Sequence, residues 1–356
     1  MFDVNSYKKR FDANKVDVLK SGRFPYVVRM GSDNGQKGFI KENEQFLNEG
    51  NTISFGQDTA TMFYQEKPYF TGDKIKILKS KDKRFNKKTA QFFILTMTKS
   101  FSSFSWGGSS FSVNIIKNQN ITLPISSKGK IDFDFMESFI SEIEAERIRK
   151  LEAYLLATGL KDYTLTTVEQ KALEGFDKIE FGEFRLGVLF EKEKTKKLPY
   201  KADELSKQII GNYTLPCLTS SFKNQGLNYF APKDGTTILK NVISIPSNSD
   251  VYRAYFQSNE FTVLSDAYAI SWIFDDVKLL PNQYLFAVQS INKITDLSIY
   301  SYKNKLGGWN VVKNKYIQLP VKNDKPDYEI MDTLISAIKK LAIKDVVLYT
   351  DKKLMN

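Results

Sequence analysis

The residues of this chain that could carry chemistry are mostly hydrogen-bonding and cationic side chains. Its 356 residues include no histidine, which is the usual general base near neutral pH and the commonest metal ligand. The lone Cys217 lies in the strand-like stretch YTLPCLTSS, which favours a small buried hydrophobe over a nucleophile. We therefore expect no triad, no zinc site, no bound cofactor and no enzymatic activity of the chain itself.

Phosphate-binding glycine motifs are also missing from the sequence. Neither G-x-x-x-x-G-K-[ST] nor G-x-G-x-x-G occurs, and GSDNGQKG (Gly31–Gly38) lacks a lysine placed before Ser or Thr. What remains is charge, because 52 Lys+Arg against 41 Asp+Glu give a formal net charge of +11. This excess favours a polyanionic partner, with a merely lysine-rich surface as the alternative.

Neither a membrane span nor a signal peptide is indicated. No apolar run approaches the ~20 residues that a transmembrane helix needs. The first fifteen residues, MFDVNSYKKRFDANK, contain no apolar core of a signal peptide. We expect a cytoplasmic protein without a membrane partner.

The elements that must position the polar side chains come in two copies. FPYVV with SDNGQKGFI (Phe24–Ile40) matches LPCLT with FKNQGLNYF (Leu215–Phe230) at an offset of 191 residues. Four later blocks match in the same order: NTISF with NVISI at 190, FYQ with YFQ at 192, KNQNITLPI with KNKYIQLPV at 196, and DFDFMESFISEI with DYEIMDTLISAI at 195. So small a drift indicates duplication of one domain and not a solenoid array.

Each copy is predicted to be a mixed, strand-rich domain followed by a long helix. The β-rich runs NTISFG, DKIKIL, AQFFILTM and NITLPI are separated by Gly, Asn, Asp and Ser. We expect the last strand of each copy to end at Pro124 or Pro320. The first helix should end near Thr158 and Gly159, and the second should run close to the chain end, with VVLYT (Val346–Thr350) as a possible strand instead.

Apolar residues in both helices follow the spacing of a coiled-coil seam. Such a seam packs either against its own domain or against the other helix. The seam positions are Phe133, Met136, Ile140, Ile143, Leu151 and Tyr154 in the first helix, and Met331, Leu334, Ile338, Leu341 and Leu348 in the second.

The order of these blocks resembles that of type I restriction-modification specificity subunits and of the related recognition subunits of BcgI-like restriction enzymes. The resemblance rests on FGEFRLGVLFE (Phe181–Glu191), the N-G and Q-G turns, the NTIS/NVIS and FYQ/YFQ strands, and the LP phrase before an acidic-aromatic helix start. It covers nearly the whole chain. The first copy lacks a clean counterpart of RLGVLFE, so its N-terminal strand is either YKKRFDANK or shortened.

The resemblance implies an α+β fold with two tandem target-recognition domains, each mixed, strand-rich and followed by a long helix. The two helices would pair as an antiparallel coiled-coil spacer. The expected boundaries are 1–126 for the first recognition domain, 127–165 for the first spacer helix with its linker, 166–322 for the second recognition domain and 323–356 for the second spacer helix.

The resemblance also implies a non-catalytic recognition subunit that reads an asymmetric bipartite target in double-stranded DNA. Its helices would dock methyltransferase subunits, which would bind S-adenosylmethionine, and a restriction subunit would be an optional further partner. DNA presents equivalent surfaces roughly every 34–36 Å, so two heads can read two half-sites. The alternative is a duplicated binding module for a glycan or a protein partner.

Loop residues are the candidate DNA contacts, because side chains read base edges while basic and hydroxyl groups hold phosphates. Loops that differ between the copies would read different half-sites. The candidates of the first copy are Arg29, Ser32, Asn34, Gln36, Lys37, Gln57, Thr59, Thr61, Lys99, Trp106 and Ser109. Those of the second are Ser220, Ser221, Lys223, Asn224, Asn248, Tyr252, Arg253, Lys303, Lys305 and Trp309. The alternatives are ordinary turns and, for both tryptophans, core packing.

Overall fold

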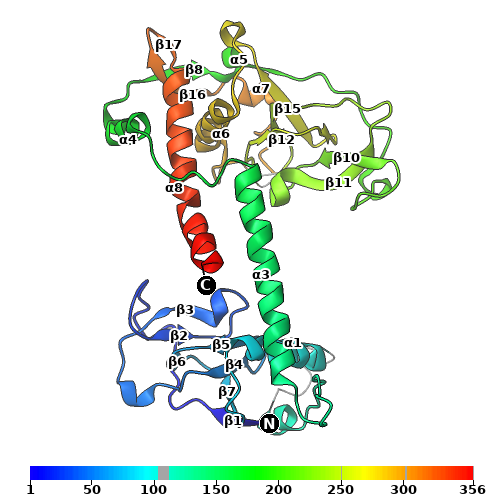
Figure 1. Cartoon of the computed structure of the whole chain (residues 1–356). Coiled ribbons are helices and arrows are strands. Elements are labelled where there is room, and N and C mark those ends of the chain that lie inside the picture. The colour runs from blue at the N-terminus through cyan, green and yellow to red at the C-terminus, as the bar shows by residue number, and fades with distance from the viewer. Residues whose placement is uncertain (103–111, 250, 301–302, 356) are drawn as a thin grey trace. The chain divides into compact units, whose positions relative to one another are not determined.

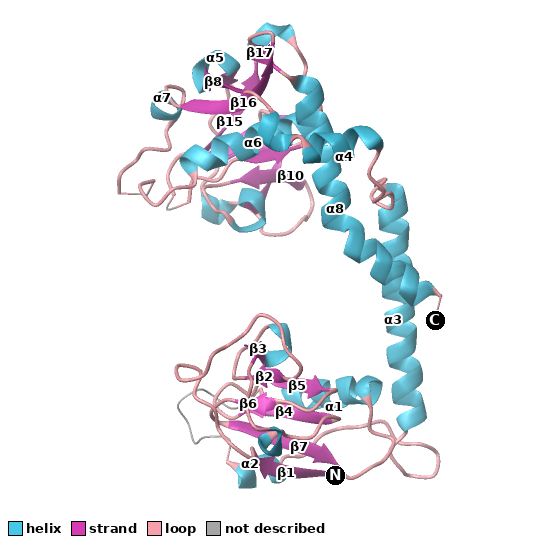
Figure 2. Cartoon of the chain, turned by 90° about the vertical axis from the view of Figure 1, so that its left-hand side faces the viewer, coloured by secondary structure: helices cyan, strands magenta, loops and turns pink. Residues whose placement is uncertain are grey.

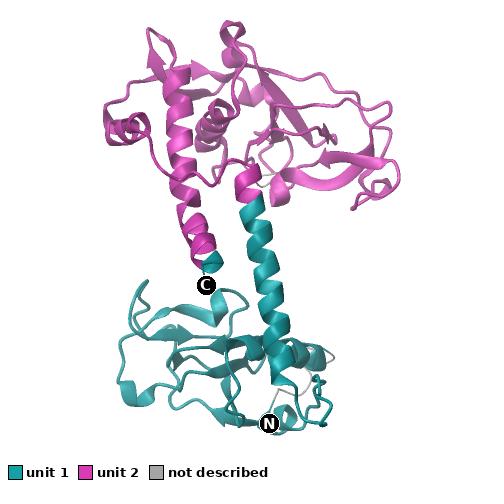
Figure 3. Ribbon diagram, in the orientation of Figure 1, with its two compact units in different colours: residues 1–153, 353–356 teal, residues 154–352 magenta. Residues whose placement is uncertain are grey.

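The structure is a computed structural model that describes residues 1–102, 112–249, 251–300 and 303–355. The candidates Trp106 and Ser109 lie outside the described residues. The chain forms two compact units, unit 1 with residues 1–153 and 353–356, and unit 2 with residues 154–352 (Figure 3). Among the described helices, none combines the length and the apolar character needed to span a membrane.

Unit 1 contains a four-stranded antiparallel sheet with the order β1-β7-β4-β5 (Figure 1). Its strands are β1 (Phe2–Ser6), β4 (Thr52–Gly56), β5 (Met62–Gln65) and β7 (Ile75–Ser80). A smaller sheet has the order β3-β2-β6, in which β2 and β6 are parallel. Its strands are β2 (Pro25–Val27), β3 (Gln36–Phe39) and β6 (Phe70–Thr71).

Helix α1 (Lys87–Phe101) packs on the larger sheet of unit 1 (Figure 2). Its buried residues Phe93 and Met97 are four apart and join β4 in one apolar cluster. A capping box starts the helix, since Thr89 N donates to Asn86 Oδ1 and Asn86 N donates to Thr89 Oγ1. The prediction that AQFFILTM forms a strand is therefore wrong.

Unit 2 repeats this arrangement. Its sheet order β13-β12-β15-β9 corresponds to β5-β4-β7-β1, and β11-β10-β14 corresponds to β3-β2-β6. The strands are β9 (Phe190–Lys192), β10 (Tyr213–Leu218), β11 (Leu227–Pro232), β12 (Val242–Pro246), β13 (Tyr255–Gln257), β14 (Thr262–Val263) and β15 (Ala267–Trp272). Helix α6 (Pro281–Thr295) corresponds to α1.

The pairing registers of the two units agree residue by residue. Ile53 pairs with Leu78 in unit 1, and their counterparts Ile243 and Ile270 pair in unit 2. The duplication predicted from the sequence is therefore also present in the strand pairing. Strand β1 pairs with β7 as β9 pairs with β15, so the N-terminal strand of the first copy is Phe2–Ser6 and not YKKRFDANK.

Unit 2 has one further sheet, with the order β17-β16-β8. It consists of β8 (Phe181–Arg185), β16 (Tyr316–Lys322) and β17 (Lys325–Pro326). The predicted strand KNKYIQLPV is confirmed, but its predicted end at Pro320 is wrong. Val321 N donates to Glu180 O at 3.0 Å, and Val321 pairs with Pro326, so the pairing continues past the proline.

The matching phrase of the first copy does not form the predicted strand. Residues 118–124 have no strand assignment, and no described strand pairs with them. In unit 2 the matching segment is β16, which pairs with β8, the strand that precedes β9. A strand paired this way depends on its neighbour, because a β-strand satisfies its backbone groups across the ladder.

The long helices are α3 (Phe133–Ala157) and α8 (Tyr328–Leu354). The predicted end of the first helix is confirmed, since Gly159 has a φ of +68° and Leu160 N donates to Leu155 O at 2.9 Å. The helix α8 includes VVLYT, so the strand alternative is wrong.

The predicted seam positions differ in exposure along each helix. Those nearest each helix start are at most 2% exposed: Phe133, Met136, Met331 and Leu334. Three later ones in α8 are 43–51% exposed: Ile338, Leu341 and Leu348. The start of each helix therefore packs into the core of its own unit.

Short elements complete the described chain. They include α2 (Val113–Lys117), α4 (Thr167–Glu174), α5 (Leu186–Leu189) and α7 (Trp309–Val312). Single 3₁₀ turns span Asp33–Gly35, Glu44–Phe46, Phe176–Lys178, Ala202–Glu204, Lys223–Gly226 and Phe274–Asp276.

Candidate nucleic-acid interface

The first candidate loop of unit 1 is the turn at Asp33–Gly35, between β2 and β3. Its three residues have φ values of +50°, +56° and +73°. Val28 N donates to Gly35 O and Gly35 N donates to Ser32 O, both at 2.8 Å, which closes the loop. Ser32, Asn34 and Lys37 are exposed, and Gln36 is half-buried.

The second candidate loop of unit 1 connects β4 to β5 and meets the first through an ion pair. Asp58 accepts hydrogen bonds from Arg29 and, at 2.9 Å, from Lys74 Nζ. These three groups together carry one net positive charge. The remaining candidates of this loop are the half-buried Gln57 and the hydroxyls of Thr59 and Thr61, which lie 2.8 Å apart.

Unit 2 forms the same turn from different residues. Asn224, Gln225 and Gly226 have φ values of +47°, +55° and +93°. Thr219 N donates to Gly226 O at 2.9 Å, as Val28 N does to Gly35 O in unit 1. Two candidates on this turn are exposed, Lys223 and Asn224.

The edge beside this turn differs in charge between the units. Ser220 Oγ donates to Asp266 Oδ2 at 2.8 Å. By the repeat offsets, Ser220 and Asp266 occupy the positions of Arg29 and Lys74. The same place is therefore basic in unit 1 and carries a carboxylate in unit 2, so the two units offer different hydrogen-bonding groups. The remaining candidate of this loop, Ser221, is half-buried.

In the β12–β13 connection of unit 2 the structure differs from the sequence prediction at one position. Tyr252 is 1% exposed, and its hydroxyl accepts from Ser249 N at 3.2 Å. The ring packs so closely on Gly307 that a Cβ there would lie 1.6 Å from Tyr252 Cε1. Tyr252 is thus a core side chain and not part of the loop surface. Burial of its apolar ring is more favourable than exposure of the ring to water in the loop.

The remaining candidates of unit 2 differ in their exposure and contacts. Arg253 Nη2 lies 2.7 Å from Asp296 Oδ2, and Asn248 is exposed. Trp309 is half-buried, with its ring centroid 6.2 Å from that of Tyr268, so its ring packs against the core. Lys303 and Lys305 are exposed, as is Lys99 in the last turn of α1 in unit 1.

Sequence reasoning missed the charged partners of these loops. Asp58 lies between the candidates Gln57 and Thr59, but its contacts are with Arg29, 29 residues away, and Lys74, 16 residues away. Asp266 was missed in the same way. The only sequence signal was the repeat itself, which aligns these positions once the offset is applied.

Two observations on the described residues concern metal ligands and nucleophiles. Within them, no group of three or more His, Cys, Asp or Glu side chains could hold a metal ion. Cys217 is fully buried, and burial raises the pKa of its thiol to about 12.

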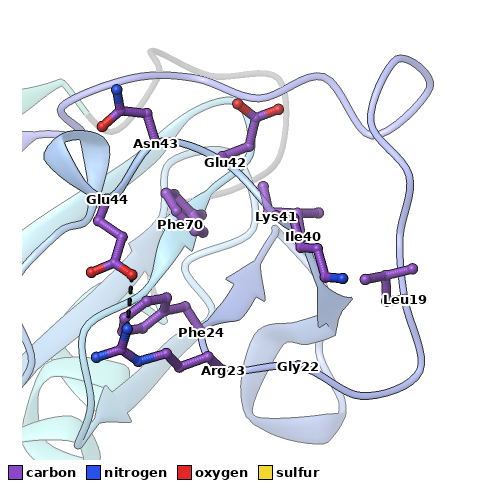
Figure 4. A pocket seen from close by; sticks show the side chains of 10 residues that line it. All are labelled: Leu19, Gly22, Arg23, Phe24, Ile40, Lys41, Glu42, Asn43, Glu44 and Phe70. Atoms are coloured by element: carbon purple, nitrogen blue, oxygen red, sulfur yellow. Dashed lines mark hydrogen bonds and ion pairs between the residues drawn. The ribbon is translucent and has the colours of Figure 1, made fainter.

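A pocket of about 420 Å³ in unit 1 is lined by Phe24 and Phe70 and by the ion pair Arg23–Glu44 (Figure 4). That pair is more than half exposed, so it contributes at most about 1 kcal/mol.

Comparison with known proteins identifies the family. The chain matches the model of the type I restriction modification DNA specificity domain over residues 1–153 and again over residues 178–349. A curated relative from Heyndrickxia coagulans, the type II restriction enzyme BgcI specificity subunit S.BcgI, is 25% identical over 343 residues, covering 93% of this chain and 90% of the relative. The crystal structure of a type I restriction-modification system S subunit from M. genitalium shares the fold, with a TM-score of 0.56 at 14% identity, and the match covers 99% of this chain and 90% of that one. The chain therefore belongs to the family of type I restriction-modification DNA specificity proteins.

Proposed function

We propose that this chain reads an asymmetric bipartite target in double-stranded DNA, with one half-site for each unit. Its family makes it a sequence-specific DNA-recognition subunit that has no catalytic role of its own. The observation that carries the bipartite proposal is the repeated loop edge. Arg29 and Lys74 line it in unit 1, and Ser220 and Asp266 line it in unit 2.

The chemistry of these edges suits different base pairs. Arg29 can donate to guanine O6 and N7, whereas the exposed amide of Asn34 suits adenine N6 and N7. In unit 2 the exposed amide of Asn224 offers the adenine pattern from a different position of the turn, and the hydroxyl of Ser220 replaces the guanidinium of Arg29. We assign the exposed Lys37 and the other candidate lysines to phosphate contacts, which hold the duplex without reading it.

We further propose that the recognition domains comprise residues 1–126 and 166–322, and that residues 127–165 and 323–356 form the spacer helices. These helices would pair antiparallel and dock methyltransferase subunits, which would bind S-adenosylmethionine. A restriction subunit would join only in a complex that cleaves DNA. The exposed apolar residues Ile338, Leu341 and Leu348 support docking at α8. The complex would act in the cytoplasm, where chromosomal DNA is accessible.

Sequencing the methylated bases of cells that carry the chain and its neighbouring methyltransferase tests the proposal. A motif with two unlike halves separated by unspecified bases is expected. An uninterrupted motif, or methylation that does not depend on this chain, would contradict it. If the chain were instead a module for a glycan or a protein, the co-expressed proteins would show no DNA preference.

A matched pair of arginine variants assigns the first half-site. Arg29→Ala should relax the preference at one half of the motif by roughly 1–3 kcal/mol and leave the other half unchanged. Arg23→Ala is the control, because Arg23 is also paired with a carboxylate in unit 1 but lies at the pocket. Equal effects of the two variants would show that Arg29 does not read a base.

A further inference from the structure

Beneath the turn of unit 1 lies a pair of polar side chains that do not face the candidate DNA surface. Gln65 and Ser54 are 3% and 2% exposed. Gln65 Nε2 donates to the backbone oxygen of Asn34 in the turn and to Ser54 Oγ, both at 3.0 Å. Ser54 Oγ in turn donates to Phe63 O at 3.2 Å. These side-chain hydrogen bonds of the pair are made to the turn and within the β4–β5 hairpin.

The turn needs support of this kind. Asp33, Asn34 and Gly35 are consecutive residues with positive φ, a region that L-residues rarely occupy. Such a conformation persists only where surrounding contacts hold it. Besides the bond from Gln65, Asn34 Nδ2 donates to Tyr64 O at 3.1 Å, so strand β5 holds the turn through two bonds.

Unit 2 contains the same glutamine–serine pair at the matching positions, Gln257 and Ser244. Gln257 Nε2 donates to Ser244 Oγ at 3.0 Å and to the backbone oxygen of Gln225 at 3.5 Å. Ser244 Oγ donates to Tyr255 O at 3.5 Å. The second copy is looser, since Gln257 is half-buried and its bond to the turn is longer.

The exposed side chains near this glutamine–serine pair differ between the units. Ser32 corresponds to Lys223, and Lys37 corresponds to Asn228, and all four are exposed. The glutamine, the serine and the positive φ values are shared, whereas the exposed groups are not. A shared support beneath unlike exposed groups points to a common way of presenting different reading side chains.

We propose that Gln65 and Gln257 are positioning residues for DNA recognition, each holding its left-handed turn in the conformation that reads one half-site. This inference rests on the proposed function, in which each unit reads one half-site. The two glutamines do not touch DNA. They act through the backbone of Asn34 and Gln225.

The test compares Gln65→Met and Gln257→Met in the complete complex with its methyltransferase, on a pool of randomised DNA duplexes. Methionine matches glutamine in length but cannot donate. Gln65→Met should lower base discrimination about tenfold in the half-site of unit 1 only, the usual scale for losing a buried hydrogen bond. Gln257→Met should affect only the other half-site, and by less. Gln45→Met, at an exposed position of unit 1, should change neither.

Each other outcome has a distinct meaning. If a variant weakened binding to all duplexes alike, or lowered thermal stability without changing base preference, the glutamine would be structural and the proposal overturned. If Gln65→Met does not fold, Ser54→Ala removes one partner of Gln65 at little cost in volume, and unchanged discrimination in that variant overturns the proposal. A wild-type complex that selects no two-part motif would count against the proposed function itself.

Discussion

Replacing Glu169 with glutamine should loosen helix α4 from α8 within unit 2. Glu169 is 5% exposed and accepts hydrogen bonds from Ser336 Oγ at 2.6 Å, Lys340 Nζ at 3.0 Å and Thr166 N at 2.7 Å. Burial raises the pKa of this carboxyl, but the hydrogen bonds from Ser336, Thr166 and Lys340 outweigh burial and lower the pKa to about 2. The carboxylate form is therefore favoured by folding.

The size of the effect follows from this pKa. A glutamate in an unfolded chain titrates near about 4.3. A folded pKa of about 2 then adds about 3 kcal/mol to the free energy of unfolding at pH 7. Because the folded pKa is lowered, the contribution is fully present above the unfolded pKa and is lost as the pH falls toward the folded one. By the same relation about half of it remains near pH 3.

Urea unfolding at pH 7 and pH 3 measures this contribution. Fluorescence of Trp272 and Trp309 reports on unit 2 when Trp106 is replaced by phenylalanine. Glu169→Gln should cost about 3 kcal/mol at pH 7 and about half as much at pH 3. Glu174→Gln, at an exposed position of the same helix, should stay within about 0.5 kcal/mol of the parent. Equal losses at both pH values, or for both variants, would refute the reasoning.

Lys37→Ala should reduce the slope of log affinity against log salt by about 1 in the assembled complex, because a lysine on a phosphate releases about one counterion; an unchanged slope contradicts that contact. Gly307→Ala should lower stability by about 3 kcal/mol in calorimetry, since its Cβ would overlap the buried Tyr252 ring. Gly308→Ala, with no atom within 4 Å of the new Cβ, should cost little, and similar losses for both would exclude the clash. Cys217 should resist alkylation until denaturant is added, because burial raises the pKa of its thiol to about 12, and fast labelling of the native protein would contradict this.

The repeat was predictable from sequence because strand pairing kept the blocks in order and in register. Elements that depend on distant partners were not. KNQNITLPI and KNKYIQLPV have similar sequences, yet among the described strands only the second segment has a partner such as β8. The stretch AQFFILTM looked like a strand because its adjacent apolar residues hide the helical period. The capping pair of Asn86 and Thr89 was the available signal for α1.

The candidate loops were found by composition, but their internal contacts were not. The ion pair between Arg29 and Asp58 joins two loops 29 residues apart, and no local sequence pattern predicts it. Tyr252 was wrongly predicted to be a surface residue of a loop. It sits in a loop by sequence position, but its ring fills the core next to a glycine. Position along the chain predicts where a loop is and not which of its side chains turn inward.

The two turns share the buried residues that hold their backbone but differ in their exposed side chains, and this difference affects the free energy of substitution. The backbone of each turn is held by bonds from Gln65 or Gln257 and by a glycine, Gly35 or Gly226, that tolerates positive φ. Exposed side chains on the turn contribute little to folding, since surface substitutions usually stay within about 0.5 kcal/mol. Recognition can therefore change by substitution at exposed positions such as Ser32 without unfolding the unit, provided that the glutamine beneath remains. The same change at the glutamine would alter the geometry of every reading group on its turn at once.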